Sequence, residues 1–244
     1  MLEIEIEIGN VKEHIDVLNE EFKDKSPEEV LKWAFDLFGE KIVLASSLGL
    51  EDQVLTDMSV KIYPKAHIFF LDTGRINQET YNVLEETMDK YKIKYKIYFP
   101  KAGEIEKLQG EFGPNPFYKS IELRHQCCHI RKIEPLQRAL KGYEAWITGL
   151  RREQNVTRVH TEIFEWDEIN NLIKINPLVN WCVIDVTEHI AENNVPYNKL
   201  FDQGYTSVGC APCTRPIKLG QDRRAGRWWW EAPEKRECGL HQKQ

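Results

Sequence analysis

The sequence has no apolar run close to the roughly 20 residues that a membrane span requires. Its first ten residues, MLEIEIEIGN, lack the basic and apolar zones of a signal peptide. Six cysteines in 244 residues are too few for a disulfide scaffold. We therefore expect a cytoplasmic protein with no membrane partner, whose cysteines serve metal binding or thiol chemistry.

An excess of positive charge is also absent. Lys and Arg number 33 against 39 Asp and Glu, which gives a net charge of -6 and argues against a nucleic-acid partner. The basic residues are nevertheless grouped, at 131–132, 151–158 and 223–227. Each group taken alone is also typical of a solvated helix face.

No linker or internal repeat divides the chain, and 41% hydrophobic content is ample for one large core. We expect a single domain over residues 1–244, with residues 1–25 as an N-terminal extension and residues 228–244 as a mobile C-terminal tail. The sequence leaves formation of a homo-oligomer open.

Apolar runs alternate with helical patterns through the first two thirds of the chain. The runs lie at 41–47, 66–74, 94–100 and 143–149, and the helical patterns at 50–60, 77–91, 101–110 and 126–141. This alternation predicts an α/β fold with a mainly parallel sheet flanked by helices. Ligands of such sheets bind at the carboxyl ends of the strands.

The flanking segments are predicted from local signals. Helical spacing covers 11–22 and 26–38, and Ser26 followed by Pro27 is a helix start signal. A strand pair is expected within 161–178 and a helix over 187–194.

The first predicted strand runs into SSLGLED, residues 46–52. Small residues such as Ser46, Ser47 and Gly49 let backbone N–H groups approach a phosphate at a helix N-terminus. A purely structural turn has the same composition, and the Gly-Lys-Ser/Thr ending of a nucleoside triphosphate loop is absent. We expect a nucleotide site here, with LDTG (71–74) and the arginine-rich loop 148–158 on the same sheet edge.

The cysteines are the strongest feature of the sequence. Cys127 and Cys128 are adjacent, and Cys210 and Cys213 have C-x-x-C spacing. Four thiolates suit either a zinc ion or an iron-sulfur cluster. Zinc sites usually separate the two ligands of a pair, whereas a cluster offers separate iron atoms to neighbouring sulfurs, so the adjacent pair favours the cluster.

Two cysteines remain. Cys182 has an apolar, strand-like context typical of a small buried core residue. Cys238 follows basic residues near the chain end and is either an incidental surface thiol or a nucleophile.

These features together resemble the assimilatory adenylyl-sulfate reductases, the cluster-containing branch of the phosphosulfate reductase family. The resemblance is carried by the Cys-Cys pair with the following Arg-Lys, the C-x-x-C, GRWWWE (226–231) and ECGLH (237–241), and it covers residues 27–244. Two features depart from the family pattern: His125 and His129 flank the cysteine pair, and LEIEIEI has no counterpart.

The resemblance implies an adenine nucleotide alpha-hydrolase-like fold and a 4Fe-4S cluster on Cys127, Cys128, Cys210 and Cys213. It implies reduction of adenosine 5'-phosphosulfate to sulfite and AMP, in which Cys238 attacks the sulfur and a thioredoxin or glutaredoxin-like reductant resolves the S-sulfocysteine. The implied substrate-binding residues are Ser46, Ser47, Gly49, Lys132, Gly149, Arg152, Arg158, Arg224, Arg227 and His241.

Three alternatives stay open at this stage. The first alternative is an enzyme that carries out the same reaction on the 3'-phosphorylated nucleotide, or on both nucleotides. A tRNA-thiolating enzyme of the same superfamily would need ATP and no terminal ECGLH. A zinc-stabilised binding module would be colourless and contain zinc.

Overall fold

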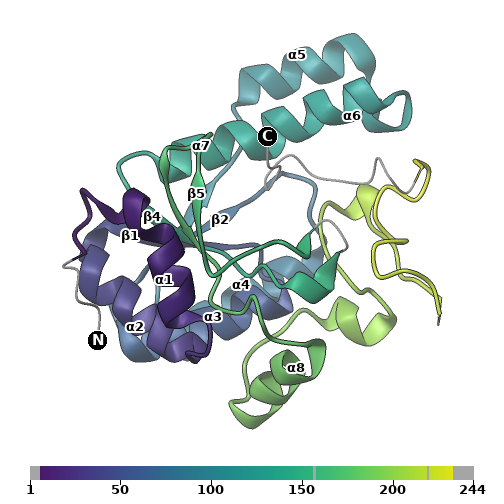
Figure 1. Cartoon of the computed structure of the whole chain (residues 1–244). Coiled ribbons are helices and arrows are strands. Elements are labelled where there is room, and N and C mark those ends of the chain that lie inside the picture. Colours follow the sequence, from purple (N-terminus) through teal and green to yellow (C-terminus); the bar gives the residue numbers. More distant parts are fainter. Residues whose placement is uncertain (1–5, 156–157, 219, 233–244) are drawn as a thin grey trace. The chain divides into compact units, whose positions relative to one another are not determined.

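The computed structural model describes residues 6–155, 158–218 and 220–232 (Figure 1). The chain divides into two compact units, each made of three separate segments. Unit 1 consists of residues 1–69, 83–96 and 140–197, and unit 2 of residues 70–82, 97–139 and 198–244. The single domain expected over 1–244 stays a prediction.

Helices and strands alternate along the chain. The α-helices are α1 (Ile15–Phe22), α2 (Pro27–Phe38), α3 (Leu50–Ile62), α4 (Gln78–Tyr91), α5 (Ala102–Phe112), α6 (Ile121–Cys128), α7 (Glu134–Leu140) and α8 (Val183–Glu192). The strands are β1 (Ile42–Ser46), β2 (His67–Leu71), β3 (Lys96–Tyr98), β4 (Ala145–Ile147), β5 (Phe164–Asp167) and β6 (Leu172–Ile175). None of the helices in the described ranges is long and apolar enough to cross a membrane.

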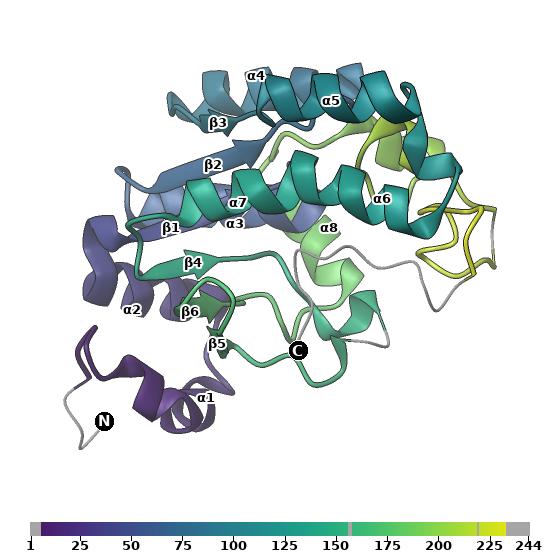
Figure 2. The ribbon, with the colours of Figure 1, turned by 90° about the horizontal axis from the view of Figure 1, so that it is seen from above.

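The strands form one sheet in the order β3-β2-β1-β4-β6-β5. β1 pairs in parallel with β4, and β4 pairs in parallel with β6, whereas β5 and β6 are antiparallel (Figure 2). The mainly parallel sheet flanked by helices is therefore confirmed. The hairpin of β5 and β6 is the strand pair that the sequence predicts within 161–178.

The two N-terminal helices cover the hairpin side of unit 1. The rings of Phe22 and Trp33 lie 5.3 and 5.0 Å from the ring of Phe164 on β5. Ser26 caps α2 as expected: its Oγ accepts from the Glu29 amide at 3.2 Å, and the Glu29 carboxylate accepts from the Ser26 amide at 2.8 Å. This reciprocal pair is a capping box, which fixes the start of α2.

The helix predicted over 187–194 is present, but its start and the buried, strand-like setting predicted for Cys182 were wrong. The helix expected over 187–194 begins four residues earlier, because the Asp185 carboxylate accepts from the Cys182 amide at 2.6 Å and so caps α8. Cys182 is half-buried at this helix start rather than a buried residue in a strand.

The helix predicted over 126–141 is longer and is interrupted. It begins with α6 after Ser120, whose Oγ accepts from the Leu123 amide at 3.1 Å. A π-helical turn, His129–Ile133, separates α6 from α7. The tail expected over 228–244 also requires a correction at its start, because Trp228 and Glu231 are buried.

Candidate functional site

The turn between β1 and α3 in unit 1 is the predicted SSLGLED segment. Ser46 ends β1, Gly49 is the N-cap of α3, and Leu48 between them has a φ of +61°. The Ser47 amide and hydroxyl both donate to Asp52 Oδ2, at 2.7 and 2.5 Å. These bonds order the turn directly at the N-terminus of a 13-residue helix, where free N–H groups favour an anion.

Asp52 is the carboxylate that holds this turn. Burial raises the pKa of Asp52 from 3.8 to about 6, against the opposing effect of its hydrogen bonds from Ser47. The group is therefore ionised near neutral pH, where it accepts both Ser47 donors, and it becomes protonated in mild acid.

The end of β4 approaches the same helix start. A Cβ atom placed on Gly149 would lie 2.4 Å from Asp52 Oδ1 and 2.9 Å from Glu51 Cβ. Only a glycine permits this approach. The predicted nucleotide-binding residues Ser46, Ser47, Gly49 and Gly149 thus gather at the carboxyl ends of β1 and β4.

The arginines of the loop after β4 are held by protein groups. Arg152 donates to Thr161 O at 2.8 Å and to the Glu162 carboxylate at 2.9 Å, and it also bonds Asn180. Arg158 donates to Gln154 Oε1. Their roles as substrate ligands stay predictions.

Sequence reasoning missed the role of Arg151 in this loop. Its side chain is buried and donates to Glu51 Oε1 at 2.8 and 2.9 Å and to Glu153 Oε2 at 2.9 Å. The pair with Glu51 joins the loop to the first turn of α3. The signal that could have found it is Glu51 itself, an acidic residue placed by SSLGLED at the predicted helix start.

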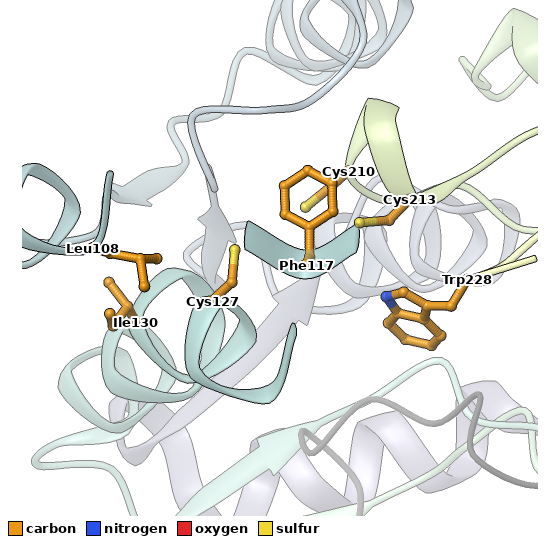
Figure 3. Packing of buried hydrophobic residues seen from close by; sticks show 7 residues of the cluster. All are labelled: Leu108, Phe117, Cys127, Ile130, Cys210, Cys213 and Trp228. Carbon is orange, nitrogen blue, oxygen red and sulfur yellow. The ribbon is translucent and has the colours of Figure 1, made fainter. Parts of the chain in front are cut away.

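The four predicted ligand cysteines line one cavity in unit 2, of about 300 Å³ including the space at its mouth. Figure 3 shows Cys127 and Cys210 with Phe117 between their segments, and Cys213 next to Cys210. The other lining residues are Arg75, Phe117, Arg131, Lys132 and Pro212. Within the described ranges, no three His, Cys, Asp or Glu side chains converge closely enough to hold a single metal ion.

The adjacent cysteines lie where the α-helix changes to a π-helical turn. Cys127 and Cys128 are the last two residues of α6, directly before the π-helical turn His129–Ile133. A π-helical turn adds a residue to the helix and is frequent at functional sites. Both thiols reach the cavity from this position, and all five described cysteines are free of disulfides.

The LDTG segment holds both cysteine segments, a role that the sequence analysis did not foresee. Thr73 Oγ1 lies 3.2 Å from Cys210 Sγ, and the Thr73 carbonyl accepts from Arg131 in the π-helical turn. The Arg75 carbonyl accepts from the Ala211 amide at 2.7 Å. Residues 73–75 therefore join the helix that carries one cysteine pair to the loop that carries the other.

Burial raises the pKa values of cavity thiols, whereas neighbouring cations lower them. Burial raises the pKa of Cys127, and Arg131 opposes this rise. Burial and the neighbouring cysteines raise the pKa of Cys213 to about 12, and Lys132 and Arg227 oppose this rise. Metal binding deprotonates such thiols, and the cations suit an anionic centre.

The predicted Arg224 and Arg227 surround one indole in unit 2. Their guanidinium carbons lie 5.9 and 4.8 Å from the Trp228 ring centroid. Arg227 packs so tightly against Gly209 that a Cβ there would lie 2.3 Å from its Nη1. The positively charged Arg227 side chain thus lies beside the Cys210 segment. Cys238 and His241 lie outside the described residues.

Comparison with known proteins agrees with this geometry. Residues 41–216 match the phosphoadenosine phosphosulfate reductase domain. An adenosine 5'-phosphosulfate reductase of Allochromatium vinosum is 48% identical over 205 residues, covering 84% of this chain and 80% of that protein. A phosphoadenylyl-sulfate reductase of Candida auris, solved with phosphate, is 33% identical with a TM-score of 0.73, covering 87% of this chain and 99% of that one.

A more distant solved structure supports the fold alone. The FMN adenylyltransferase of Candida glabrata is 16% identical, with a TM-score of 0.55, and the match covers 92% of this chain and 83% of that one. The predicted adenine nucleotide alpha-hydrolase-like fold is thus confirmed. From the matched domain and these relatives, the chain belongs to the phosphoadenosine phosphosulfate reductase family.

Proposed function

We propose that this enzyme reduces adenosine 5'-phosphosulfate to sulfite and AMP in assimilatory sulfate reduction. The observation that carries the proposal is the cavity lined by Cys127, Cys128, Cys210 and Cys213, because the paired cysteines are the feature expected of the branch that uses this nucleotide. The 48% identity to an adenosine 5'-phosphosulfate reductase supports the same substrate.

The four cysteines fit a 4Fe-4S cluster better than a zinc ion. Their thiols line one cavity of about 300 Å³, yet no three of the described candidate ligands are placed to share one ion. A cluster presents a separate iron atom to each thiolate, so the sulfurs need not converge on one point. When bound, the cluster would order the cysteine loops and tune the local field.

The nucleotide would bind at the ordered turn in unit 1. Ser46, Ser47 and Gly49 form the turn at the start of α3, which the bonds from Ser47 to Asp52 order, and Gly149 closes on the same turn. The helix N-terminus stabilises a bound phosphate. Arg152 and Arg158 are proposed to contribute further positive charge from the loop after β4.

Cys238 is the proposed nucleophile. Its thiolate attacks the sulfur of the sulfuryl group, a bond forms between the two sulfur atoms, and the bond from sulfur to the bridging oxygen breaks. AMP leaves with that electron pair on its phosphate oxygen. Lys132, Arg224, Arg227 and His241 are proposed to stabilise the charge on the sulfuryl oxygens and the leaving phosphate.

A dithiol protein of the thioredoxin or glutaredoxin-like class completes the cycle. One of its thiolates attacks Sγ of the S-sulfocysteine, and sulfite leaves with the electron pair of the broken sulfur-sulfur bond. Its second thiolate then releases Cys238 as a thiolate. The two electrons gained by the substrate sulfur come from this partner, which ends as a disulfide. A cytoplasmic location, where such partners are kept reduced, belongs to the same proposal.

The 3'-phosphorylated nucleotide is a second candidate substrate, favoured by the 33% identity to the Candida auris phosphoadenylyl-sulfate reductase. Turnover on the two nucleotides, measured with reduced thioredoxin, decides between them. We expect sulfite and AMP in equal amounts from adenosine 5'-phosphosulfate and a much lower kcat/KM for the 3'-phosphorylated form. A preference for the latter would reject the proposed substrate.

A further inference from the structure

The last described segment of the chain is tied to the helix that carries the cysteine pair. Arg124 on α6 donates through Nε to Glu231 Oε1 at 2.9 Å and through Nη2 to Glu231 Oε2 at 2.8 Å. The two side chains are 1% and 3% exposed. They are 107 residues apart in the sequence, so this pair forms only in the folded unit.

Two parallel bonds of this kind fix orientation as well as distance, because the guanidinium and carboxylate planes must align. The Arg124 guanidinium carbon also lies 4.7 Å from the centroid of the Trp228 ring. Trp228 is held in turn by its amide, which donates to the Cys213 carbonyl at 3.2 Å, and its carbonyl accepts from the Glu231 amide at 2.8 Å. The segment 228–231 is therefore anchored both to the Cys213 segment and to α6.

A buried ion pair is weak evidence for stability, since two apolar side chains of similar volume often stabilise a fold as well or better. Its specific contribution is geometric. Cys238 follows Glu231 by seven residues, which span at most about 25 Å when extended. Because the chain links the two residues, the position of Glu231 limits how far from the folded segment the Cys238 thiol can lie, and this limit bears on its effective concentration at a bound substrate.

We propose that Arg124 and Glu231 are positioning residues for the nucleophile, acting through the described segment 228–231 that precedes Cys238 in the chain. This inference rests on the proposed function of Cys238. Loss of the pair slows transfer of the sulfuryl group to Cys238 and leaves nucleotide affinity unchanged. Neither residue is proposed to contact the substrate, so neither is called catalytic.

The test measures single-turnover formation of the S-sulfocysteine by rapid quench and mass spectrometry, in the iron-loaded, reduced full chain. Glu231→Gln keeps the shape of the side chain and removes its charge. We expect a rate about 10- to 100-fold below wild type, as for misplaced reacting groups, with the AMP dissociation constant within about twofold of wild type. A wild-type rate in Glu231→Gln would overturn the inference.

A second variant separates positioning from stability. Arg124→Met with Glu231→Leu replaces the ion pair by apolar side chains and leaves no buried charge, so it should restore folding and iron content. We expect it to remain as slow as Glu231→Gln, because the aligned bonds are gone. Full recovery of the rate in this double variant would show a role in stability alone and would overturn the inference.

If neither of these variants folds, Glu231→Asp provides the test. It keeps the negative charge and shifts the carboxylate by one methylene. Its rate should fall between wild type and Glu231→Gln, and a wild-type rate would count against positioning. Glu134→Gln is the matched control, because Glu134 pairs with Lys101 at 2.9 Å in the same unit at a partly exposed site. If the wild type itself forms no S-sulfocysteine, the proposed function fails rather than this inference.

Discussion

At the scale of single residues, Asp52 controls the turn that the nucleotide is proposed to use. It accepts two hydrogen bonds from Ser47, and its pKa of about 6 places its loss of charge in mild acid. The unfolded chain has the ordinary pKa of 3.8. Between these values the folded state binds more protons than the unfolded state.

Asp52 therefore lowers the stability of the protein as pH rises from about 4 to 6, by about 3 kcal/mol for a shift of this size. Asp52→Asn removes this dependence. We would measure the free energy of unfolding in urea from pH 4 to 7. Relative to wild type, the variant should gain about 3 kcal/mol in this free energy between pH 4 and 6. Above this range the difference between the two proteins should stay constant. Parallel pH profiles for the two proteins would contradict the assignment.

Gly149 is the residue that lets the end of β4 approach α3. Gly149→Ala places a Cβ within 3 Å of Asp52 Oδ1 and Glu51 Cβ, and we expect a loss of about 1–3 kcal/mol of stability together with weaker AMP binding. Gly103→Ala is the control. Gly103 lies in α5 with no atom within 4 Å of the added Cβ, so alanine there should stabilise the helix by up to about 1 kcal/mol.

At the scale of elements, the two cysteine segments form a site only because other segments hold them. α6 and its π-helical turn present one pair, and the loop before Cys210 together with the short helix Ala211–Cys213 presents the other. Thr73 contacts both segments, and Arg75 contacts the second one through the Ala211 amide. The proposed cluster would therefore depend on residues 73–75 as well as on its four ligands.

Cys213→Ser should abolish the visible iron-sulfur absorbance and the bound iron of the purified protein, because one of four ligands is lost. Cys182→Ser is the matched control, since Cys182 occupies the N-cap position of α8 in unit 1 and is not among the residues that line the cavity. It should keep wild-type iron content. Iron and zinc are measured by elemental analysis, and stoichiometric zinc without iron in the wild type would reject the cluster.

At the scale of the whole molecule, the sequence predicts the alternating elements, the mainly parallel sheet and the approach of the two cysteine pairs. Hydrophobic period and turn residues are local signals, so they locate β1, α3 and the Ser26 cap well. The start of α8 was missed because the capping carboxylate, Asp185, is three residues inside the helix and Cys182 is a poor N-cap signal.

The remaining features depend on contacts between distant residues. The bonds of Thr73 to the cysteine segments and of Arg124 to Glu231 link positions 58 to 137 residues apart. No local pattern contains such a pairing. Glu231 also explains why the predicted tail starts too early. The sequence GRWWWE has no helix or strand pattern, and nothing local to it indicates that Glu231 pairs with Arg124 on α6.

The central claim is that Cys238 accepts the sulfuryl group of adenosine 5'-phosphosulfate. The most direct measurement is the intact mass of the reduced, iron-loaded protein after incubation with this nucleotide and without a reductant. We predict a mass increase of one SO₃ group, mapped to Cys238, absent in Cys238→Ser and removed by reduced thioredoxin with release of sulfite. An unmodified wild-type protein that still produces sulfite, or the same modification in Cys238→Ser, would contradict the account.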